Sequence, residues 1–212
     1  MTENITAFTQ NSIRVKGKDF TVYIDPFRMK EEPKDADFIL ITHDHYDHFS
    51  PDDIEKVACG KTVLVVPKKM EKKAEKVASY VSKIETVSPS NQYNINGLSF
   101  ETVPAYNILK PFHPKMNEWV GYILSIDGKR IYIAGDTDET KEAKEVKCDI
   151  AMIPIGGTYT MDAKKAAELI NIIKPEVAIP VHYGTVVGSP NDASVFKDLV
   201  KEPVKVEILL ME

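Results

Sequence analysis

Residues 42–48 read THDHYDH and contain three of the five histidines in the chain. His43 and His45 lie two residues apart, so an extended backbone projects both imidazoles from the same face. Asp47 and His48 follow where the chain turns, and the four side chains together can present ligands to two adjacent metal ions. Imidazole and carboxylate ligands suit zinc best, and iron or manganese less exclusively. The stretch therefore predicts a metal site.

The flanking elements place this stretch at the end of a buried strand. Residues 38–42 form a continuous apolar run with β-branched members, which is typical of a strand covered on both faces. Ser50 and Pro51 then begin a predicted helix that reaches residue 58, with serine at the N-cap and acids in the first turn. The alternative interpretations of residues 42–48 are a turn that caps this helix and a histidine-rich metal scavenger on the surface.

The rest of the chain alternates short strands with turn signals and a few helices. Residues 68–80 carry apolar side chains at helical spacing among lysines and glutamates, which predicts an amphipathic surface helix. Thr160 is the expected N-cap of a helix that spans residues 161–173. The predicted strands are 13–15, 20–24, 38–42, 63–66, 84–87, 93–95, 98–103, 121–126, 130–134, 150–153, 177–181 and 204–210. Because hairpins and helices return to buried strands, the pattern predicts an α/β fold with two sheets, each covered by helices.

Polar residues stand just past four of these strands. They are Asp25, His43, Asp136 and His182. Taken alone, an aspartate in a Gly-Asp-Thr-Asp turn is most often a turn former, and a single histidine can be a buried core residue. Rigid strand ends, however, can aim ligands from several segments at one point, which favours metal binding. Two adjacent glycines at residues 156–157 also permit a close backbone approach to a ligand or to the metal loop, with an ordinary turn as the alternative.

The composition limits the classes to which the chain can belong. Its 212 residues suit a single domain over 1–212, and 27 basic against 32 acidic residues give a net charge of −5, which argues against a nucleic-acid surface. No apolar run approaches the roughly 18 residues of a membrane span. No signal peptide is visible in MTENITAFTQ, so we expect a cytoplasmic protein with a small-molecule substrate and no nucleic-acid partner. The composition leaves the oligomeric state open, a homo-oligomer included.

The run from His43 to His48 resembles the HxHxDH signature of the metallo-β-lactamase superfamily, and the likeness covers nearly the whole chain. Pro104-Ala105, the Gly-Gly-Thr-Tyr segment at 156–159 and the small size are similar to its lactonase-like and N-acyl phosphatidylethanolamine phospholipase D-like branch. The resemblance implies an α/β (α+β) fold, a four-layer αβ/βα sandwich of two similar halves with a two-metal site at one edge.

The resemblance also implies roles for residues outside the signature. Asp25 would support the loop without binding metal, Asp136 would bridge the metals and His182 would be the last histidine ligand. The sequence departs from the family pattern at the third histidine, because Asn107 stands where an imidazole is expected after Pro104-Ala105. His113, the only histidine left, is assigned as the missing ligand, with a loop histidine as the alternative. The implied ligand sets are His43, His45 and His113 for one metal, Asp47, His48 and His182 for the other, and Asp136 between them.

These residues together imply a metal-dependent hydrolase that is binuclear. Two divalent ions, zinc or alternatively manganese, would supply a bridging hydroxide that cleaves a small ester, lactone or phosphodiester. Asp47 would orient the hydroxide as well as bind metal. The alternative function is metal-dependent binding or sensing with little turnover. A site in which Asn107 faces the metal and His113 turns away would favour that alternative.

Overall fold

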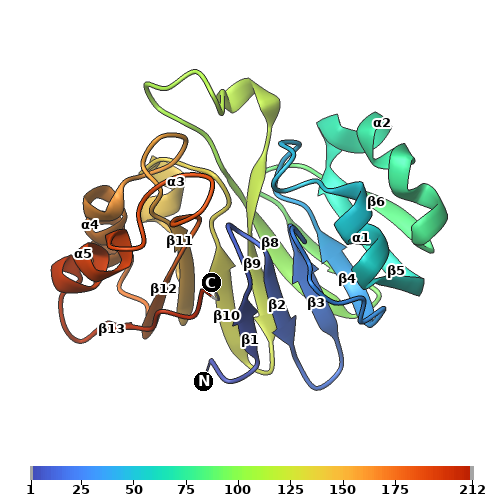
Figure 1. Ribbon diagram of the computed structural model, residues 1–212, viewed down its shortest axis with the longest axis horizontal. Helices are drawn as coiled ribbons and strands as arrows, with labels where there is room; N and C mark the ends of the chain where they lie inside the picture. Colours follow the sequence, from blue (N-terminus) through green and yellow to red (C-terminus); the bar gives the residue numbers. More distant parts are fainter. Residues whose placement is uncertain (1, 211–212) are drawn as a thin grey trace. The chain divides into compact units, whose positions relative to one another are not determined.

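The computed structural model describes residues 2–210. They divide into two compact units, one made of residues 2–88 with Leu210 and the other of residues 89–209. Each unit contains one β-sheet of its own. Figure 1 shows the first sheet in blue to green and the second in yellow-green to red. Within residues 2–210, every helix is too short or too polar to cross a bilayer.

The first unit is a six-stranded sheet whose spatial order follows the chain order, β1 to β6. The first three strands pair antiparallel, and the last four, starting from β3, pair parallel. The strands predicted over 13–15 and 20–24 are confirmed and pair as an antiparallel hairpin, with Val15 opposite Val22. The strands are β1 (Ile5–Ala7), β2 (Ile13–Lys16), β3 (Thr21–Ile24), β4 (Ala36–Leu40), β5 (Ala58–Pro67) and β6 (Lys83–Val87). Parallel neighbours need a crossover, and helix α1 (Pro51–Val57) provides the one between β4 and β5.

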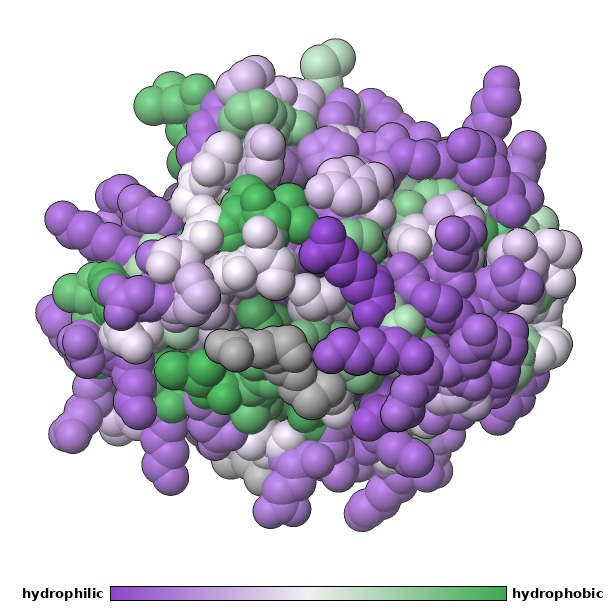
Figure 2. Space-filling view, viewed as in Figure 1, coloured by the Kyte–Doolittle hydropathy of each residue, from purple (hydrophilic) through white to green (hydrophobic). Residues whose placement is uncertain are grey.

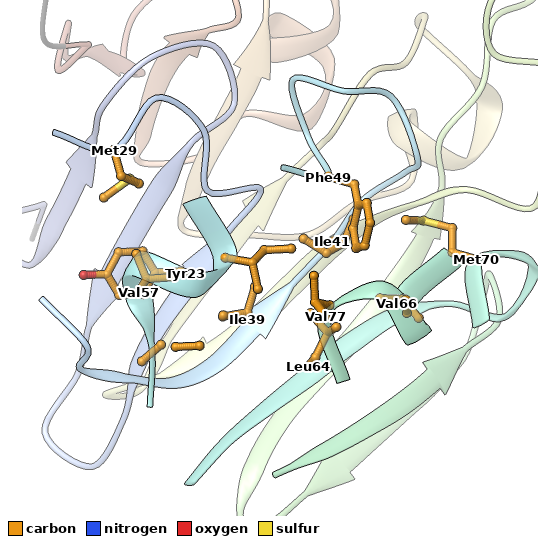
Figure 3. Packing of buried hydrophobic residues seen from close by; sticks show 14 residues of the cluster. Tyr23, Met29, Ile39, Ile41, Phe49, Val57, Leu64, Val66, Met70 and Val77 are labelled. Carbon is orange, nitrogen blue, oxygen red and sulfur yellow. The ribbon is translucent and has the colours of Figure 1, made fainter. Parts of the chain in front are cut away.

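A hydrophobic cluster holds the crossovers of the first unit against its sheet. Figure 3 shows Ile39 and Leu64 from β4 and β5 together with Val57 from α1 and Val77 from the second crossover. Each side chain buried in this way contributes about 1.5–3 kcal/mol. Phe49 also belongs to the cluster, which anchors the chain directly after the THDHYDH stretch.

The segment expected as one helix over residues 68–80 is broken into three short pieces. They are the 3-10 helix η1 (Lys68–Met70), the helix α2 (Glu71–Ala74) and the 3-10 helix η2 (Glu75–Tyr80). Its apolar residues still face the core, but its lysines recur four residues apart, and like charges at that spacing disfavour an α-helix. Figure 2 shows mainly hydrophilic residues over the surface of α1 and α2, as the amphipathic pattern predicts.

The second unit repeats the plan of the first in a seven-stranded sheet. Its strands β7 to β10 pair antiparallel and β10 to β13 pair parallel. The elements are β7 (Gln92–Ile95), β8 (Leu98–Pro104), the 3-10 helix η3 (Lys115–Asn117), β9 (Val120–Ile126), β10 (Lys129–Ile133), α3 (Lys141–Lys144), β11 (Ile150–Pro154), α4 (Ala163–Ile173), β12 (Val177–Val181), α5 (Asp192–Leu199) and β13 (Lys205–Val206). In both units an antiparallel start leads into parallel strands, so the expectation of two similar halves is confirmed.

Two boundaries in the second unit differ from the prediction by two residues or more. The last strand, expected over 204–210, is limited to Lys205–Val206, because Leu210 instead forms a bridge with Ala7 of β1. Helix α4 begins after Asp162, whose carboxylate accepts a hydrogen bond from the backbone N–H of Lys165 at 2.8 Å. A carboxylate at this position satisfies a free N–H of the first turn, so Asp162 and not Thr160 is the N-cap.

The loop between β8 and β9 exposes large apolar side chains. Leu109 and Met116 are 95% and 75% exposed, and Ile108 and Phe112 are also on the surface. Figure 2 shows hydrophobic residues gathered on this loop. Between them, His113 is completely buried.

Candidate metal centre

The THDHYDH stretch forms a tight turn between β4 and α1. The backbone N–H groups of His48 and Phe49 both donate to the carbonyl of His45, at 3.1 and 2.8 Å. His43, Asp47 and His48 are buried. The turn therefore buries three of the four side chains predicted to bind metal and leaves His45 partly exposed, whereas a metal scavenger on the surface would expose its ligands.

The potential ligand atoms of the first unit lie close together. Nε2 of His43 is 3.1 Å from Nδ1 of His45, and Nε2 of His48 is 3.6 Å from Oδ2 of Asp47. The ligand atoms of His43 and His48 lie within 4.8 Å of one another. Asp44, the remaining acid of the stretch, points elsewhere, because Lys73 pairs with its carboxylate at 3.3 Å and also donates to its backbone carbonyl. The first unit thus groups all four of its predicted ligands.

Asp25 organises this group from a buried position. Its carboxylate accepts hydrogen bonds from Nδ2 of Asn11 at 2.7 Å, from the N–H and hydroxyl of Thr42 at 2.8 and 2.6 Å, and from Nδ1 of His48 at 2.7 Å. A carboxylate only accepts, so Nδ1 of His48 carries the hydrogen and its Nε2 keeps a lone pair. Asp25 also has a φ of +45°, a strained conformation that is concentrated at functional sites. These contacts agree with the supporting role that the resemblance implies.

Thr42 fixes the tautomer of His43 in a similar way. Its hydroxyl gives its hydrogen to Asp25 and can therefore only accept from Nδ1 of His43, 3.0 Å away. Nε2 of His43 then also has a lone pair. The donor set therefore fits a divalent metal ion, because the lone pair of His48 Nε2 faces the carboxylate of Asp47, and a cation between two such groups removes their repulsion.

In the second unit, Asp136 lies between two histidines. Its Oδ2 is 3.4 Å from Nε2 of His113, and its Oδ1 is 3.2 Å from Nε2 of His182. All three side chains are buried. Asp136 and His182 follow the ends of β10 and β12, and His113 comes from the loop between β8 and β9. Each carboxylate oxygen faces a different imidazole, which is the arrangement that a bridging carboxylate needs.

His113 and Asn107, the two alternatives for the third histidine position, occupy different places. Nε2 of His113 faces Asp136, whereas Oδ1 of Asn107 lies 3.1 Å from the other ring nitrogen, Nδ1 of His113. The ring also packs edge-on against Trp119, with centroids 5.4 Å apart. In the second unit it is therefore the imidazole of His113 that lies beside Asp136, and the amide of Asn107 contacts the other nitrogen of that ring.

Tyr106, adjacent to Asn107 in the chain, forms its hydrogen bond with Glu142. Its hydroxyl donates to Oε2 of Glu142 at 2.8 Å, and partial burial together with this hydrogen bond raises the pKa of Tyr106. The phenol therefore stays protonated at neutral pH, and its hydrogen points to Glu142.

Gly156, in the loop after β11, lies against the backbone that carries His182. A Cβ at this position would collide with the carbonyl oxygen of His182 and with a methyl group of Val187. His182 itself has a φ of +57°. Gly156 thus approaches the backbone of His182 closely, and its neighbour Gly157, with a φ of +86°, adopts the turn conformation that was the alternative. An approach of this pair to the metal loop stays a prediction.

We expect Gly156→Ala to destabilise the protein by about 1–3 kcal/mol and to weaken metal binding, because the new methyl group displaces His182. Gly60→Ala is the matched control, since no atom lies within 4 Å of its Cβ position. Urea unfolding and metal analysis would measure both effects. Equal behaviour of the two variants would contradict the tight packing at Gly156.

Sequence reasoning missed two residues near the first group of ligands. Asn11 donates to Asp25, and Nε2 of Gln10 lies 3.5 Å from Oδ2 of Asp47. Both side chains are fully buried, and Gln10 has a φ of +50°. No local pattern marks them, because their partners lie 14 and 37 residues away in the chain.

Comparison with known proteins supports the class that the fold and the two groups of ligands define. Residues 4–182 match the family model described as the Beta-lactamase superfamily domain. The chain is 32% identical over 207 residues to a UPF0173 metal-dependent hydrolase of Pyrococcus abyssi, with 89% of this chain and 88% of the relative covered. A second such hydrolase, of Methanopyrus kandleri, is 30% identical over 230 residues and covers 98% and 96%.

Solved structures show the same fold. A protein of Parabacteroides distasonis described as a metal-dependent hydrolase superposes with a TM-score of 0.81 at 30% identity, covering 98% of this chain and 93% of that one. A metallo hydrolase of Ignicoccus hospitalis gives a TM-score of 0.79 at 23% identity and covers 97% and 94%. The predicted fold class, with two sheets in a mixed α/β chain, is confirmed. The chain belongs to the metallo-β-lactamase superfamily, within its family of UPF0173 metal-dependent hydrolases.

Proposed function

We propose that this metal-dependent hydrolase uses two divalent metal ions to cleave a small ester, lactone or phosphodiester. Zinc is the proposed metal, with manganese as the alternative, because nitrogen and carboxylate ligands suit both. The observation that carries the proposal is Asp136, whose two oxygens face two different imidazoles. A carboxylate placed in this way can serve two metal ions at once.

The proposed ligand sets are those that the resemblance implies, within a single hydrolase domain proposed over residues 1–212. One metal is assigned to His43, His45 and His113, the other to Asp47, His48 and His182, and Asp136 to both. The assignment rests on the HxHxDH motif and on the grouping of ligands within each unit. When bound, the two ions supply hydroxide at neutral pH and polarise the carbonyl or phosphoryl oxygen of the substrate.

The side chains of this site have separate tasks in the proposed reaction. Asp47 would orient the attacking water or hydroxide by accepting a hydrogen bond from it, because an ionised carboxylate is an acceptor only. Asp25 and Thr42 hold the imidazoles of His48 and His43 in the tautomer that leaves Nε2 for a metal. Burial of His43, His48 and His113 excludes competing water from these ligands.

Metal analysis of the purified protein, followed by activity assays, tests the proposal. We expect about two zinc or manganese ions per chain after loading, and loss of all hydrolysis on removal of the metals with a chelator. Assays should compare lactones, bis-p-nitrophenyl phosphate and cyclic nucleotides, with each metal in turn. p-Nitrophenyl esters of increasing acyl length should be included, because the loop beside His113 exposes Leu109 and Met116.

Two results would contradict the proposal in different ways. A protein that binds no divalent transition metal under any loading condition would refute the metal site. A protein that binds two metals but hydrolyses none of these substrates would instead support binding or sensing with little turnover.

A further inference from the structure

We propose that Asn107 is a positioning residue that sets the tautomer of His113, so that Nε2 is the ring atom offered to the metal. The inference rests on the proposed function, since it takes His113 as a ligand. It extends the expectation drawn from the sequence, in which His113 is the assigned ligand and Asn107 the residue that could face the metal in its place. In the structure the two residues act together.

The first step is the orientation of the Asn107 side-chain amide. Its Nδ2 donates to the backbone carbonyl of Tyr159 at 2.9 Å, and its Oδ1 accepts from the backbone N–H of His113 at 3.2 Å. A backbone carbonyl only accepts and a backbone N–H only donates. Rotating the amide by half a turn would therefore lose both hydrogen bonds, so the oxygen is the atom that faces His113.

The second step follows for the imidazole. Nδ1 of His113 is 3.1 Å from the same Oδ1 of Asn107, and an amide oxygen is only an acceptor. Nδ1 therefore carries the hydrogen, and the neutral ring keeps its lone pair on Nε2. That atom faces Oδ2 of Asp136. The ring is fully buried against Trp119, so the imidazole cannot turn over unless the side chains around it repack.

The third step is a comparison with His48 in the first unit. There a carboxylate, Asp25, accepts from Nδ1 at 2.7 Å, whereas for His113 a neutral amide accepts at 3.1 Å. A carboxylate partner raises the basicity of a metal-binding imidazole more than a neutral one does, because charge-assisted hydrogen bonds are the stronger ones. Asn107 therefore orients the ring of His113 but strengthens it as a ligand less than Asp25 strengthens His48.

Substitution of Asn107 tests the inference through metal affinity. Asn107→Leu keeps the approximate volume but removes the acceptor, and we expect about 10- to 100-fold weaker binding of one of two zinc ions. Asn107→Asp keeps the acceptor and should recover most of that affinity, although it loses the bond to Tyr159. Zinc per chain would be measured during titration with a competing chelator.

Lys110→Met is the matched control. Lys110 ties the same loop to other partners, the carboxylate of Asp138 at 2.7 Å and the backbone carbonyl of Thr160. A loss of zinc affinity equal to that of Asn107→Leu would show that Asn107 merely holds the loop, which would overturn the inference.

Nitrogen-15 NMR of the histidine rings in the zinc-loaded wild-type protein provides a test that needs no variant. We expect His113 to carry its hydrogen on Nδ1, and a hydrogen on Nε2 would overturn the inference. The proposed function fails separately, if the wild-type chain binds no metal at all. Two metals bound equally well by wild type and Asn107→Leu would refute only the role of Asn107.

Discussion

Asp136→Asn should abolish hydrolysis and lower the number of bound metals while the protein stays folded. The amide keeps the volume of the side chain but removes its charge and one of the two acceptor oxygens that face His113 and His182. A metal site supplies several kcal/mol of transition-state stabilisation, so activity should fall by about 10³-fold or more. Metal analysis, circular dichroism and the ester and phosphodiester assays would measure the three quantities.

Asp127→Asn is the matched control for this substitution. The substitution removes the same charge, but Asp127 lies in the turn just before β10, whereas Asp136 follows the end of that strand. We expect this variant to keep its metals and its activity. If Asp136→Asn also retained two tightly bound metals, Asp136 would not be the shared ligand.

Asp25→Ala should lower the free energy of unfolding by about 3–5 kcal/mol, even in the metal-free protein. The substitution leaves the donors of Asn11, Thr42 and His48 buried without their common acceptor. Urea unfolding after removal of metal by a chelator separates this effect from any loss of bound metal. The loaded variant should also bind metal more weakly, because Nδ1 of His48 loses its partner.

Asp19→Ala is the control for this prediction, since Asp19 is an exposed acid in the turn between β2 and β3. Its substitution should change the stability by no more than about 0.5 kcal/mol. Equal unfolding curves for the two variants would show that the hydrogen bonds of Asp25 contribute little to the fold.

Much of the fold could be predicted because its strands are marked locally. The hairpin at Val15 and Val22 and the buried strand β4 follow from short apolar runs next to turn residues. Two boundary predictions were wrong, one at a choice between neighbouring N-cap residues and the other at a long-range bridge. Thr160 has a good N-cap side chain, yet Asp162 caps α4, and the strand expected up to Leu210 is cut short by the bridge to Ala7.

The residues of the candidate site likewise include some that the sequence predicts and some that it does not. The THDHYDH stretch is visible in the sequence because its ligands are adjacent, and Asp136 and His182 are visible because each ends a strand. No local sequence pattern identifies the polar residues that hold the ligands in position. Asn11 reaches Asp25 across 14 positions, and Asn107 reaches Tyr159 across 52.

The sequence by itself determined which residue types this protein offers to a metal, since spacing and chemistry along the chain identify them. Only the tertiary structure decided how those residues are oriented. The ring nitrogen that each histidine presents depends on the group that accepts from its other nitrogen. For His48 that group is Asp25 and for His113 it is Asn107, and folding brings both into place from other parts of the chain.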